Sequence, residues 1–427
     1  MKTVVLVAPW FVPNNLASVH RARLWANHLP ELGWKPIILT VRSEYYEEKP
    51  EPQLERLLPR DLQIVRSRAF PITKPRLVGD IGWRSVIFMR GELKRLRKMQ
   101  RIDFVHFTVP AFPPALLGPW LDRTGTPYGL DYIDPWVPEK LFSHLPGGKA
   151  WWAQQLGIWL EPVAVKKARL ITGITEGYYQ GMLHRNPHLK TQAVTRAMPY
   201  GFDVRDHLEA RNGITGSRPV FPQDGKINLV YAGALLPRAH DNLRLFLQAL
   251  LRLEKEPTWK GKVRVTFIGT GPDPKRPDLY AIRWIAEKMG VGGLVQEVPG
   301  RLPYLDVIRN LEAADGIVVI GSDEAHYSPS KIYQSMVSGK PIFGLMHPES
   351  LATRTIREMG AGLVATNPDT PALTTEVLAE KLKEYLSKVL PEFRAVELRK
   401  LEKWSARASA RTLAQALEEA ISLTEVT

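Results

Sequence analysis

The chain of 427 residues contains 58 Lys and Arg, 44 Asp and Glu, and no Cys, which gives a formal net charge of +14. The absence of Cys excludes disulfides, thiol catalysis and thiolate metal sites and is typical of a reducing compartment, so we expect a cytoplasmic protein. With 44% hydrophobic and 24% charged residues, the composition is that of a globular protein, and the length predicts two domains.

Short apolar runs alternate with helical segments in the first half of the chain, a pattern typical of parallel sheets with crossover helices. The first run follows a single Lys and lacks a small-residue cleavage site, so it predicts a strand rather than a signal peptide. No apolar run approaches the ~20 residues that a spanning helix needs. We expect an N-terminal domain over residues 1–205, with strands at Thr3–Ala8, Pro36–Thr40, Gln63–Arg66, Phe104–Thr108, Pro127–Tyr132 and Leu170–Gly173.

A basic segment, residues 84–101, holds seven basic residues and one acid. Its apolar residues have helical spacing, and Trp83 and Phe88 are available for an interface. The segment therefore either docks on an anionic membrane leaflet or packs its apolar residues on its own domain. The net charge also predicts an anionic partner, whereas no nucleic-acid-binding motif is present and no nucleic acid is expected. The apolar stripe consists of Val86, Met89, Leu93 and Leu96.

A second stripe, rich in aromatic residues, follows further along the chain. We expect it to belong to the core. If its side chains are exposed instead, they would extend a membrane face or hold a lipid acceptor. Its members are Trp151, Trp152, Leu156 and Trp159.

Polar residues follow two strands of this domain. Asp134 comes directly after an apolar strand, which places its carboxylate at the C-terminal edge of the sheet. Here it would bond hydroxyl groups or act as a base, unless it only caps a helix or forms a turn. Asn14 and Asn15 follow the first strand, and they either line a ligand cleft or form an ordinary turn, since Asn tolerates left-handed backbone.

The polar, Gly- and Pro-containing stretch at 206–225 predicts an interdomain linker. A second domain over residues 226–403 follows, and the tail at 404–427 has the apolar stripe of a helix. The predicted strands of the second domain are Ile227–Ala232, Arg264–Gly269, Leu294–Val298, Gly316–Ile320, Pro341–Leu345 and Leu363–Ala365.

The segment Ser328–Pro341 predicts a phosphate-binding helix that follows a buried strand. Ser328 and Ser330 favour a helix start, and Ile332 points inward. Lys331 stands where the helix dipole already carries positive partial charge, a conflict that a bound anion would resolve. We therefore expect the amides of Ser330 and Lys331, with the Lys331 ammonium, to bind phosphate or diphosphate.

Gly269-Thr270-Gly271 follows a predicted strand. Two glycines at this spacing permit close approach of the backbone to a nucleotide, although an ordinary turn has the same pattern. The sequence therefore predicts either a nucleotide-binding loop or an ordinary turn here.

Eight segments in this order resemble the glycosyltransferase-4-like family, whose members use nucleotide sugars and have the GT-B fold. The resemblance implies two Rossmann-like, doubly wound parallel-sheet domains that face a cleft, with the C-terminal helix crossing back onto the first domain. The matching segments are Val4–Pro9 with its loop to Ser18, Leu29–Trp34 leading into Ile37–Thr40, Asp131–Trp136, Met198–Asp203, Leu229–Gly233, Phe267–Pro272, Val298–Pro303 and Ser328–Pro341.

The resemblance also implies roles for single residues. Arg238 aligns with an Arg that neutralises the donor diphosphate, and Thr108 stands where many members have a sugar-contacting His. Two family glutamates that face the donor sugar and the ribose are replaced here by His326 and Gln334. The implied catalytic set is Asp134, Arg238 and Lys331. The implied donor-binding set adds Gly233, Gly269, Gly271, the base-holding loop Gly300-Arg301-Leu302, Ser328, Ser330 and Ile332.

The resemblance implies transfer of a sugar, with retention, from a nucleotide sugar to a glycan, a lipid-linked molecule or another hydroxyl acceptor. The resemblance also implies that no metal or other cofactor takes part, which agrees with the scarcity of Asp-x-Asp or clustered carboxylate signatures in the chain. Two alternatives remain: a catalytically silent protein that binds nucleotide sugar or a partner at a membrane, and a nucleotide-sugar epimerase.

Overall fold

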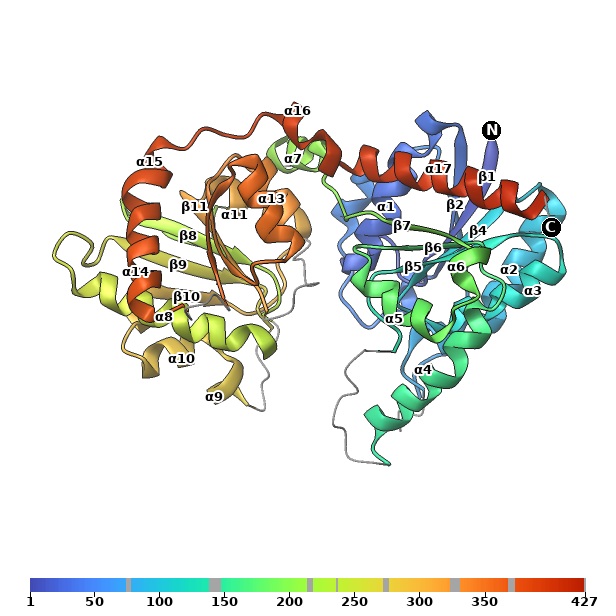
Figure 1. The fold of residues 1–427 in the computed structure, drawn as a ribbon, viewed down its shortest axis with the longest axis horizontal. Helices are drawn as coiled ribbons and strands as arrows, with labels where there is room; N and C mark the ends of the chain where they lie inside the picture. The colour runs from blue at the N-terminus through green and yellow to red at the C-terminus, as the bar shows by residue number, and fades with distance from the viewer. Residues whose placement is uncertain are drawn as a thin grey trace. The chain divides into compact units, whose positions relative to one another are not determined.

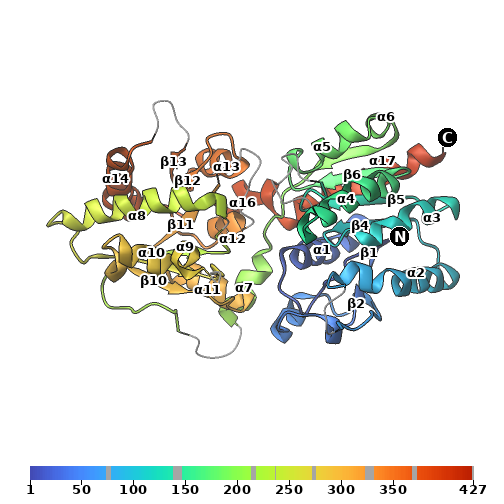
Figure 2. The same ribbon diagram turned by 90° about the horizontal axis from the view of Figure 1, so that it is seen from below.

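The computed structural model divides the chain into two compact α/β units (Figures 1 and 2). Unit 1 comprises Met1–Gly201 and Trp404–Thr427, and unit 2 comprises Phe202–Lys403. The structure describes residues 1–73, 78–137, 147–212, 218–235, 237–271, 276–322, 331–367 and 373–425.

Unit 1 is built on a seven-stranded parallel sheet with the strand order β3-β2-β1-β4-β5-β6-β7. Its central strands are buried on both faces, as their continuous apolar runs require. The strands are β1 Lys2–Val7, β2 Trp34–Val41, β3 Gln63–Ser67, β4 Phe104–Val109, β5 Tyr128–Tyr132, β6 Leu170–Gly173 and β7 Val194–Ala197.

The helices of unit 1 cover both faces of this sheet. From β3 to β7 the chain moves across the sheet in one direction, so right-handed crossovers place α2, α3, α4 and α5 on the same face. The other face carries α1 and α17, which lie against each other (Figure 1). The helices are α1 Ala17–His28, α2 Ile81–Met99, α3 Gly118–Arg123, α4 Lys149–Val165, α5 Gly177–Arg185, α6 Leu189–Gln192 and α17 Ala406–Glu425, with short 3-10 turns η1 Pro30–Leu32, η2 Ser43–Tyr45, η3 Pro52–Leu57 and η4 Pro113–Leu117.

Unit 2 contains a six-stranded parallel sheet with the order β10-β9-β8-β11-β12-β13. The strands are β8 Ile227–Ala232, β9 Val263–Ile268, β10 Val295–Val298, β11 Gly316–Ile320, β12 Ile342–Met346 and β13 Gly362–Thr366. Its helical elements are α7 Val204–Asn212, η5 Pro237–Ala239, α8 His240–Lys255, α9 Pro277–Tyr280, α10 Ile282–Lys288, η6 Gly292–Leu294, α11 Tyr304–Ala313, α12 Lys331–Val337, α13 Leu351–Met359, α14 Thr375–Glu384, η7 Tyr385–Val389, α15 Leu390–Glu392 and α16 Leu398–Leu401, after which η8 Glu402–Trp404 leads into unit 1.

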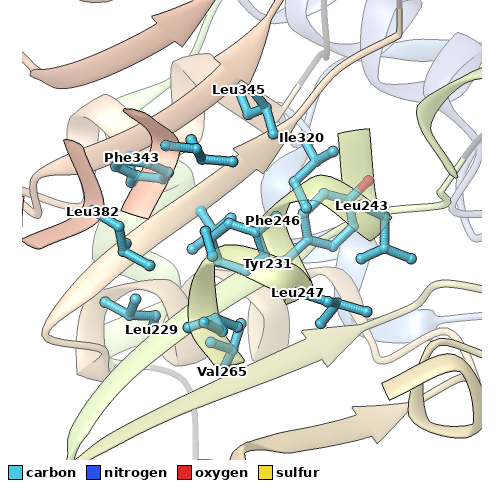
Figure 3. Packing of buried hydrophobic residues seen from close by; sticks show 14 of the residues in the cluster. Leu229, Tyr231, Leu243, Phe246, Leu247, Val265, Ile320, Phe343, Leu345 and Leu382 are labelled. Carbon is cyan, nitrogen blue, oxygen red and sulfur yellow. The ribbon is translucent and has the colours of Figure 1, made fainter. Parts of the chain in front are cut away.

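The core of unit 2 forms where α8 and α14 pack on the sheet (Figure 3). Phe246 from α8 lies 6.1 Å from Phe343 of β12, measured between ring centroids, and both side chains are fully buried. This packing fixes the position of the strands whose ends carry the candidate donor site.

Each of the twelve predicted strands corresponds to a strand of the structure, whereas β7 was not predicted because only Val194 of its four residues is buried. The predicted linker at 206–225 also differs from the structure. Residues as far as Asn212 form α7, which packs on α11, and the boundary between the units lies at Gly201–Phe202.

Candidate nucleotide and acceptor sites

Three turns of unit 2 meet at the C-terminal edge of its sheet. The amide of Gly233, after β8, donates to the carbonyl of Ile268, and the distance is 2.9 Å. The amide of Gly269, after β9, donates to the carbonyl of Val298 at 2.8 Å, and the Gly271 amide donates to the carbonyl of Pro299 at 3.0 Å. These bonds join the ends of β8, β9 and β10, so the predicted glycine loops lie side by side.

The backbone of these turns requires glycine. Gly269 and Gly271 have φ values of 71° and 60°, and Gly233 has a φ of 137°. Chain neighbours aside, a Cβ added at Gly269, Gly271 or Gly300 would meet no atom of the described residues within 4 Å. The turns after β9 and β10 therefore leave open space beside their backbone.

Two arginines stand at the same edge of the sheet. Arg238 lies in η5, between β8 and α8, and Arg301 follows Gly300 after β10. Both are exposed at the surface, and the neighbouring Leu302 is half-buried. Each of them follows a strand of this sheet, Arg238 after β8 and Arg301 after β10.

The predicted phosphate helix is present as α12, which starts at Lys331. Ile332 is fully buried, as expected, and the chain leaves the helix through Gly339 with a φ of 74°. At the end of β11, the side-chain amide of Asn242 on α8 donates to the carbonyl of Gly321 at 2.9 Å. The remaining expected contacts of this helix, His326, Ser328 and Ser330, lie outside the described residues.

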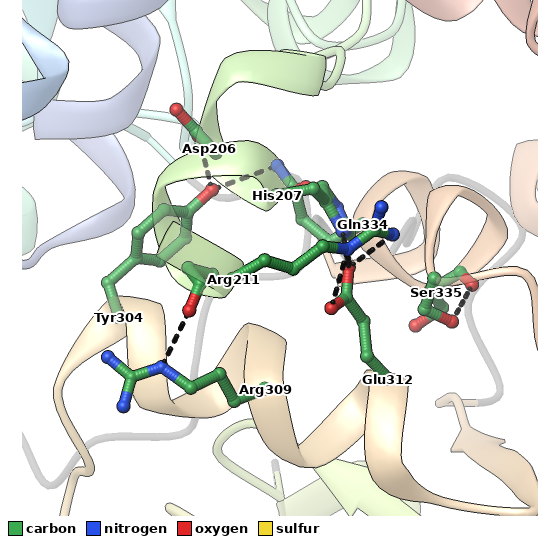
Figure 4. Close-up of polar contacts among 10 residues, drawn as sticks. Asp206, His207, Arg211, Tyr304, Arg309, Glu312, Gln334 and Ser335 are labelled. Atoms are coloured by element: carbon green, nitrogen blue, oxygen red, sulfur yellow. Dashed lines mark hydrogen bonds and ion pairs between the residues drawn. The ribbon is translucent and has the colours of Figure 1, made fainter. Parts of the chain in front are cut away.

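Gln334 belongs to a buried polar network rather than to an open surface (Figure 4). Its carbonyl oxygen accepts from His207 Nε2 at 2.9 Å, and its amide nitrogen donates to the Tyr304 hydroxyl at 2.9 Å. Tyr304 in turn donates to Asp206 Oδ2 at 2.7 Å. The expected ribose-binding side chain thus joins α12 to α7 and α11.

The network explains why an amide stands at this position. Tyr304 gives its only hydroxyl proton to Asp206, so its oxygen needs a donor, and a glutamate carboxylate at 334 would have none. His207 Nδ1 also donates to Glu312 at 2.8 Å. Burial alone would raise the pKa of Glu312, but hydrogen bonds from His207 and Arg211 hold that pKa below its usual value.

We expect Gln334→Leu to lower the free energy of unfolding of unit 2 by about 2 kcal/mol, because it leaves Tyr304 and His207 with unsatisfied buried groups. Urea unfolding measures the change. The matched control is Gln248→Leu, which removes an exposed amide whose oxygen accepts from Thr375. A parent-like stability of Gln334→Leu would contradict the structural role and favour a residue that serves only a ligand.

In unit 1, Asp134 follows β5, as predicted, and is exposed at the surface. The surrounding protein nevertheless displaces enough water to raise the pKa of its carboxyl group to about 6. At neutral pH the group is therefore a carboxylate with more affinity for a proton than an ordinary Asp. This property suits a base or an acceptor of hydrogen bonds from hydroxyl groups.

An aromatic pair, which the sequence did not reveal, lies beside Asp134. Phe112 and Trp136 stack with their ring centroids 4.9 Å apart and an interplanar angle of 13°. Trp136 also packs against Gly157 of α4, where an added Cβ would lie 3.1 Å from the indole. A signal for this pair was nevertheless present in the sequence, because Phe112 follows β4 and Trp136 follows β5 by a few positions each.

Other predicted residues of unit 1 have partners within the protein. Thr108 was expected to face the cleft, but it is 1% exposed and donates to the Val7 carbonyl at 3.1 Å. A residue of the central strand β4 is covered on both faces, which corrects that expectation. Asn14 and Asn15 donate to Glu48 and Glu51, at 2.9 Å and 2.7 Å.

Among the described residues, no group of three or more His, Asp or Glu side chains is suited to hold a metal ion. Within the same residues, no helix combines the length and the apolar character needed to cross a bilayer.

Comparison with known proteins gave matches among solved structures. No protein-family model matched the chain, and no curated protein sequence did. The Anabaena protein HepE in complex with UDP and glucose is 11% identical, with 100% of this chain and 98% of that chain covered and a TM-score of 0.58.

Two trehalose-phosphate synthases are similarly related. OtsA, a trehalose-6-phosphate synthase, is 14% identical over 98% of this chain and 99% of its own, with a TM-score of 0.62. The UDP-forming trehalose-phosphate synthase from Burkholderia xenovorans is 14% identical over the same shares, with a TM-score of 0.59. With its two parallel sheets and their crossover helices, the chain therefore has the α/β fold of the GT-B glycosyltransferases.

Proposed function

We propose that this protein is a glycosyltransferase that moves a sugar from a nucleotide-sugar donor to a hydroxyl group of a glycan or lipid-linked acceptor. The observation that carries the proposal is the set of glycine turns after β8, β9 and β10. These turns are joined by backbone hydrogen bonds, and at Gly269, Gly271 and Gly300 they open onto space where a side chain would otherwise stand. Ligands of open parallel sheets bind beyond such strand ends.

The donor is a uridine nucleotide sugar in this proposal. Two of the similar structures support that choice, since HepE was solved with UDP-glucose and the Burkholderia xenovorans synthase is UDP-forming. Backbone amides at Gly269 and Gly271 would approach the nucleotide, and the Gly300–Leu302 loop would hold the base.

The chemistry follows from the charge that develops on the departing nucleoside diphosphate. Arg238 and Lys331 are cations suited to stabilise that charge without a metal ion, an effect that is large when the groups are held in place beforehand. Asp134 would receive the acceptor proton or orient the hydroxyl group. The alternative proton acceptor is an oxygen of the leaving phosphate. In that case the sugar would be transferred with retention.

Thermal unfolding in the presence of UDP, GDP, ADP, CMP and dTDP tests the donor site. At 100-fold saturation, the matching nucleotide should stabilise the protein by about 2.7 kcal/mol. Lys331→Ala should abolish this stabilisation by the nucleotide. The control Lys260→Ala, on the surface of unit 2, should retain it.

The other outcomes separate the alternatives. If no nucleotide stabilises the protein, a silent GT-B protein that binds another partner is favoured. If a nucleotide binds but its sugar is isomerised without an acceptor, product analysis would identify an epimerase.

A further inference from the structure

Helix α4 exposes a continuous apolar stripe. Four side chains at spacings of four, three and four residues lie on one side of the helix. Trp152 is 49% exposed, Leu156 41%, Trp159 59% and Val163 49%. The expectation that Trp152, Leu156 and Trp159 belong to the core is therefore wrong.

The opposite side of α4 already has its partners. Glu161 and Ala164 are fully buried, and the Arg185 guanidinium forms an ion pair with Glu161 at 2.6 Å. Gly157 lets Trp136 pack closely against this side. The helix is thus anchored to unit 1 by one side and presents a second apolar side outward. Contiguous exposed apolar surface of this kind marks an interaction site, unlike scattered single residues.

The neighbouring helix α2 has a different exposed side. Its predicted apolar stripe packs on unit 1, because Met89, Leu93 and Leu96 are fully buried. Its outward side begins with two apolar residues, Trp83 and Ile87, which are 40% and 66% exposed. The same side continues with exposed basic residues, which are Arg90, Lys94, Arg95 and Lys98.

Both helices present these sides to the same surface. They cover one face of the sheet, and η4 contacts both of them, while α3 packs against α4 (Figures 1 and 2). Arg90 and Arg97 of α2 lie over the ring of Trp120 on α3, at 5.4 Å and 5.7 Å from its centroid. The exposed side of α2 is thus linked to α3, which in turn packs against α4.

The charge of this region is predominantly positive. Lys166 and Lys167, both exposed, directly follow the end of α4. The acids of α2 and α4 are neutralised, since Glu92 pairs with Arg95 at 2.8 Å and Glu161 pairs with Arg185, and α3 adds one acid, Asp122, and one base, Arg123. Exposed tryptophans next to an unbalanced row of Lys and Arg are the features with which proteins bind the headgroup region of anionic membranes.

We propose that the surface formed by α2, α3 and α4 docks unit 1 on an anionic lipid bilayer. Trp152, Leu156, Trp159 and Val163 enter the headgroup region, and the basic side of α2 contacts the anionic headgroups. A second copy of the chain is a poorer occupant, because it would bring two surfaces of the same positive charge together.

Co-sedimentation of the full chain with lipid vesicles tests the docking surface. The parent protein should bind vesicles that contain phosphatidylglycerol and leave pure phosphatidylcholine vesicles unbound. Trp152→Ser with Trp159→Ser should weaken binding on the order of 100-fold. Lys94→Gln with Lys98→Gln should weaken it roughly 25-fold, at about fivefold for each basic residue, and added salt should weaken parent binding.

Matched controls use equally exposed residues of unit 2. Val377→Ser with Leu398→Ser removes two side chains that are 47% and 48% exposed, and Lys260→Gln with Lys262→Gln removes two exposed charges. Both controls should bind vesicles like the parent. All the substitutions lie on the surface, so thermal unfolding should stay close to that of the parent.

Three results would overturn the proposal. The first is a parent protein that fails to bind anionic vesicles, and the second is unchanged binding in both docking variants. The third is a parent dimer that the tryptophan substitutions convert to a monomer without loss of vesicle binding, which would assign the stripe to self-association. Because no nucleotide is present in these assays, they succeed or fail independently of the proposed glycosyl transfer.

Discussion

Replacing Arg21 by Met should lower the free energy of unfolding of unit 1 by about 3–5 kcal/mol, since it leaves a buried carboxylate without its cation. Arg21 and Asp131 are both fully buried, and the guanidinium Nε and Nη2 each donate to the carboxylate at 3.0 Å. Nη1 also donates to the carbonyls of Met198 and Pro199, at 2.6 Å and 2.7 Å. The pair therefore joins α1 to β5 and to the last residues before the boundary between the units.

Urea unfolding of three variants checks this result. Arg101→Ala is the matched control, because its ion pair with Asp103 has the same chemistry with an Arg side chain that is 89% exposed. That control should change the free energy of unfolding by about 0–1 kcal/mol. Arg21→Met combined with Asp131→Leu should recover part of the loss, because no buried charge remains. A loss no greater than that of the control would contradict the role assigned to the pair.

Replacing Asp134 by Asn should lower turnover by about 100- to 10,000-fold, as expected when a general base is removed. Turnover of the parent should rise with pH through about 6, the value to which the loss of water around the carboxyl group raises the pKa of Asp134. The rise occurs because only the ionised group accepts a proton. The pH dependence of kcat/KM, measured with the nucleotide sugar that binds, gives both results.

The same substitution should make the folded protein more stable at neutral pH. The carboxyl pKa in the folded state lies above its ordinary value of 3.8, so folding takes up a proton between these two values. Above pH 6 the folded state must hold an unfavourable carboxylate, and Asn removes that requirement. Glu176→Gln, an exposed carboxylate after β6, is the control for both measurements. If Asp134 only caps a helix, Asn would replace it without loss of turnover.

The strands could be predicted from the sequence because they are short apolar runs buried on both faces. β1 shows the rule, since Val4, Val5, Leu6 and Val7 are all fully buried. β7 shows its limit, because an edge strand with one buried residue leaves no such run. The glycine turns were also predictable, since a positive φ after a strand selects glycine in the sequence itself.

Features that depend on distant partners could not be predicted. α7 contains Asp206 and His207, which are buried only because Tyr304, Gln334 and Glu312 satisfy their hydrogen bonds. A polar sequence of this kind predicts a linker. The stripe of α4 shows the reverse case, because its apolar sequence predicts a core although its side chains are 41–59% exposed among the described residues. In both segments, the partner rather than the composition decides the burial.

The C-terminal helix α17 has a consequence for the order in which the protein is made. Unit 2 is one continuous stretch, Phe202–Lys403, whereas unit 1 needs Trp404–Thr427 as well as its first 201 residues. Within unit 1, Trp25 of α1 donates to the Ser409 hydroxyl of α17 at 3.0 Å, so the packing of the first helix depends on residues that are synthesised after the whole of unit 2. During translation, unit 2 therefore leaves the ribosome with all its segments while unit 1 still lacks one. The side of α1 that carries Trp25 stays uncovered until α17 has been synthesised.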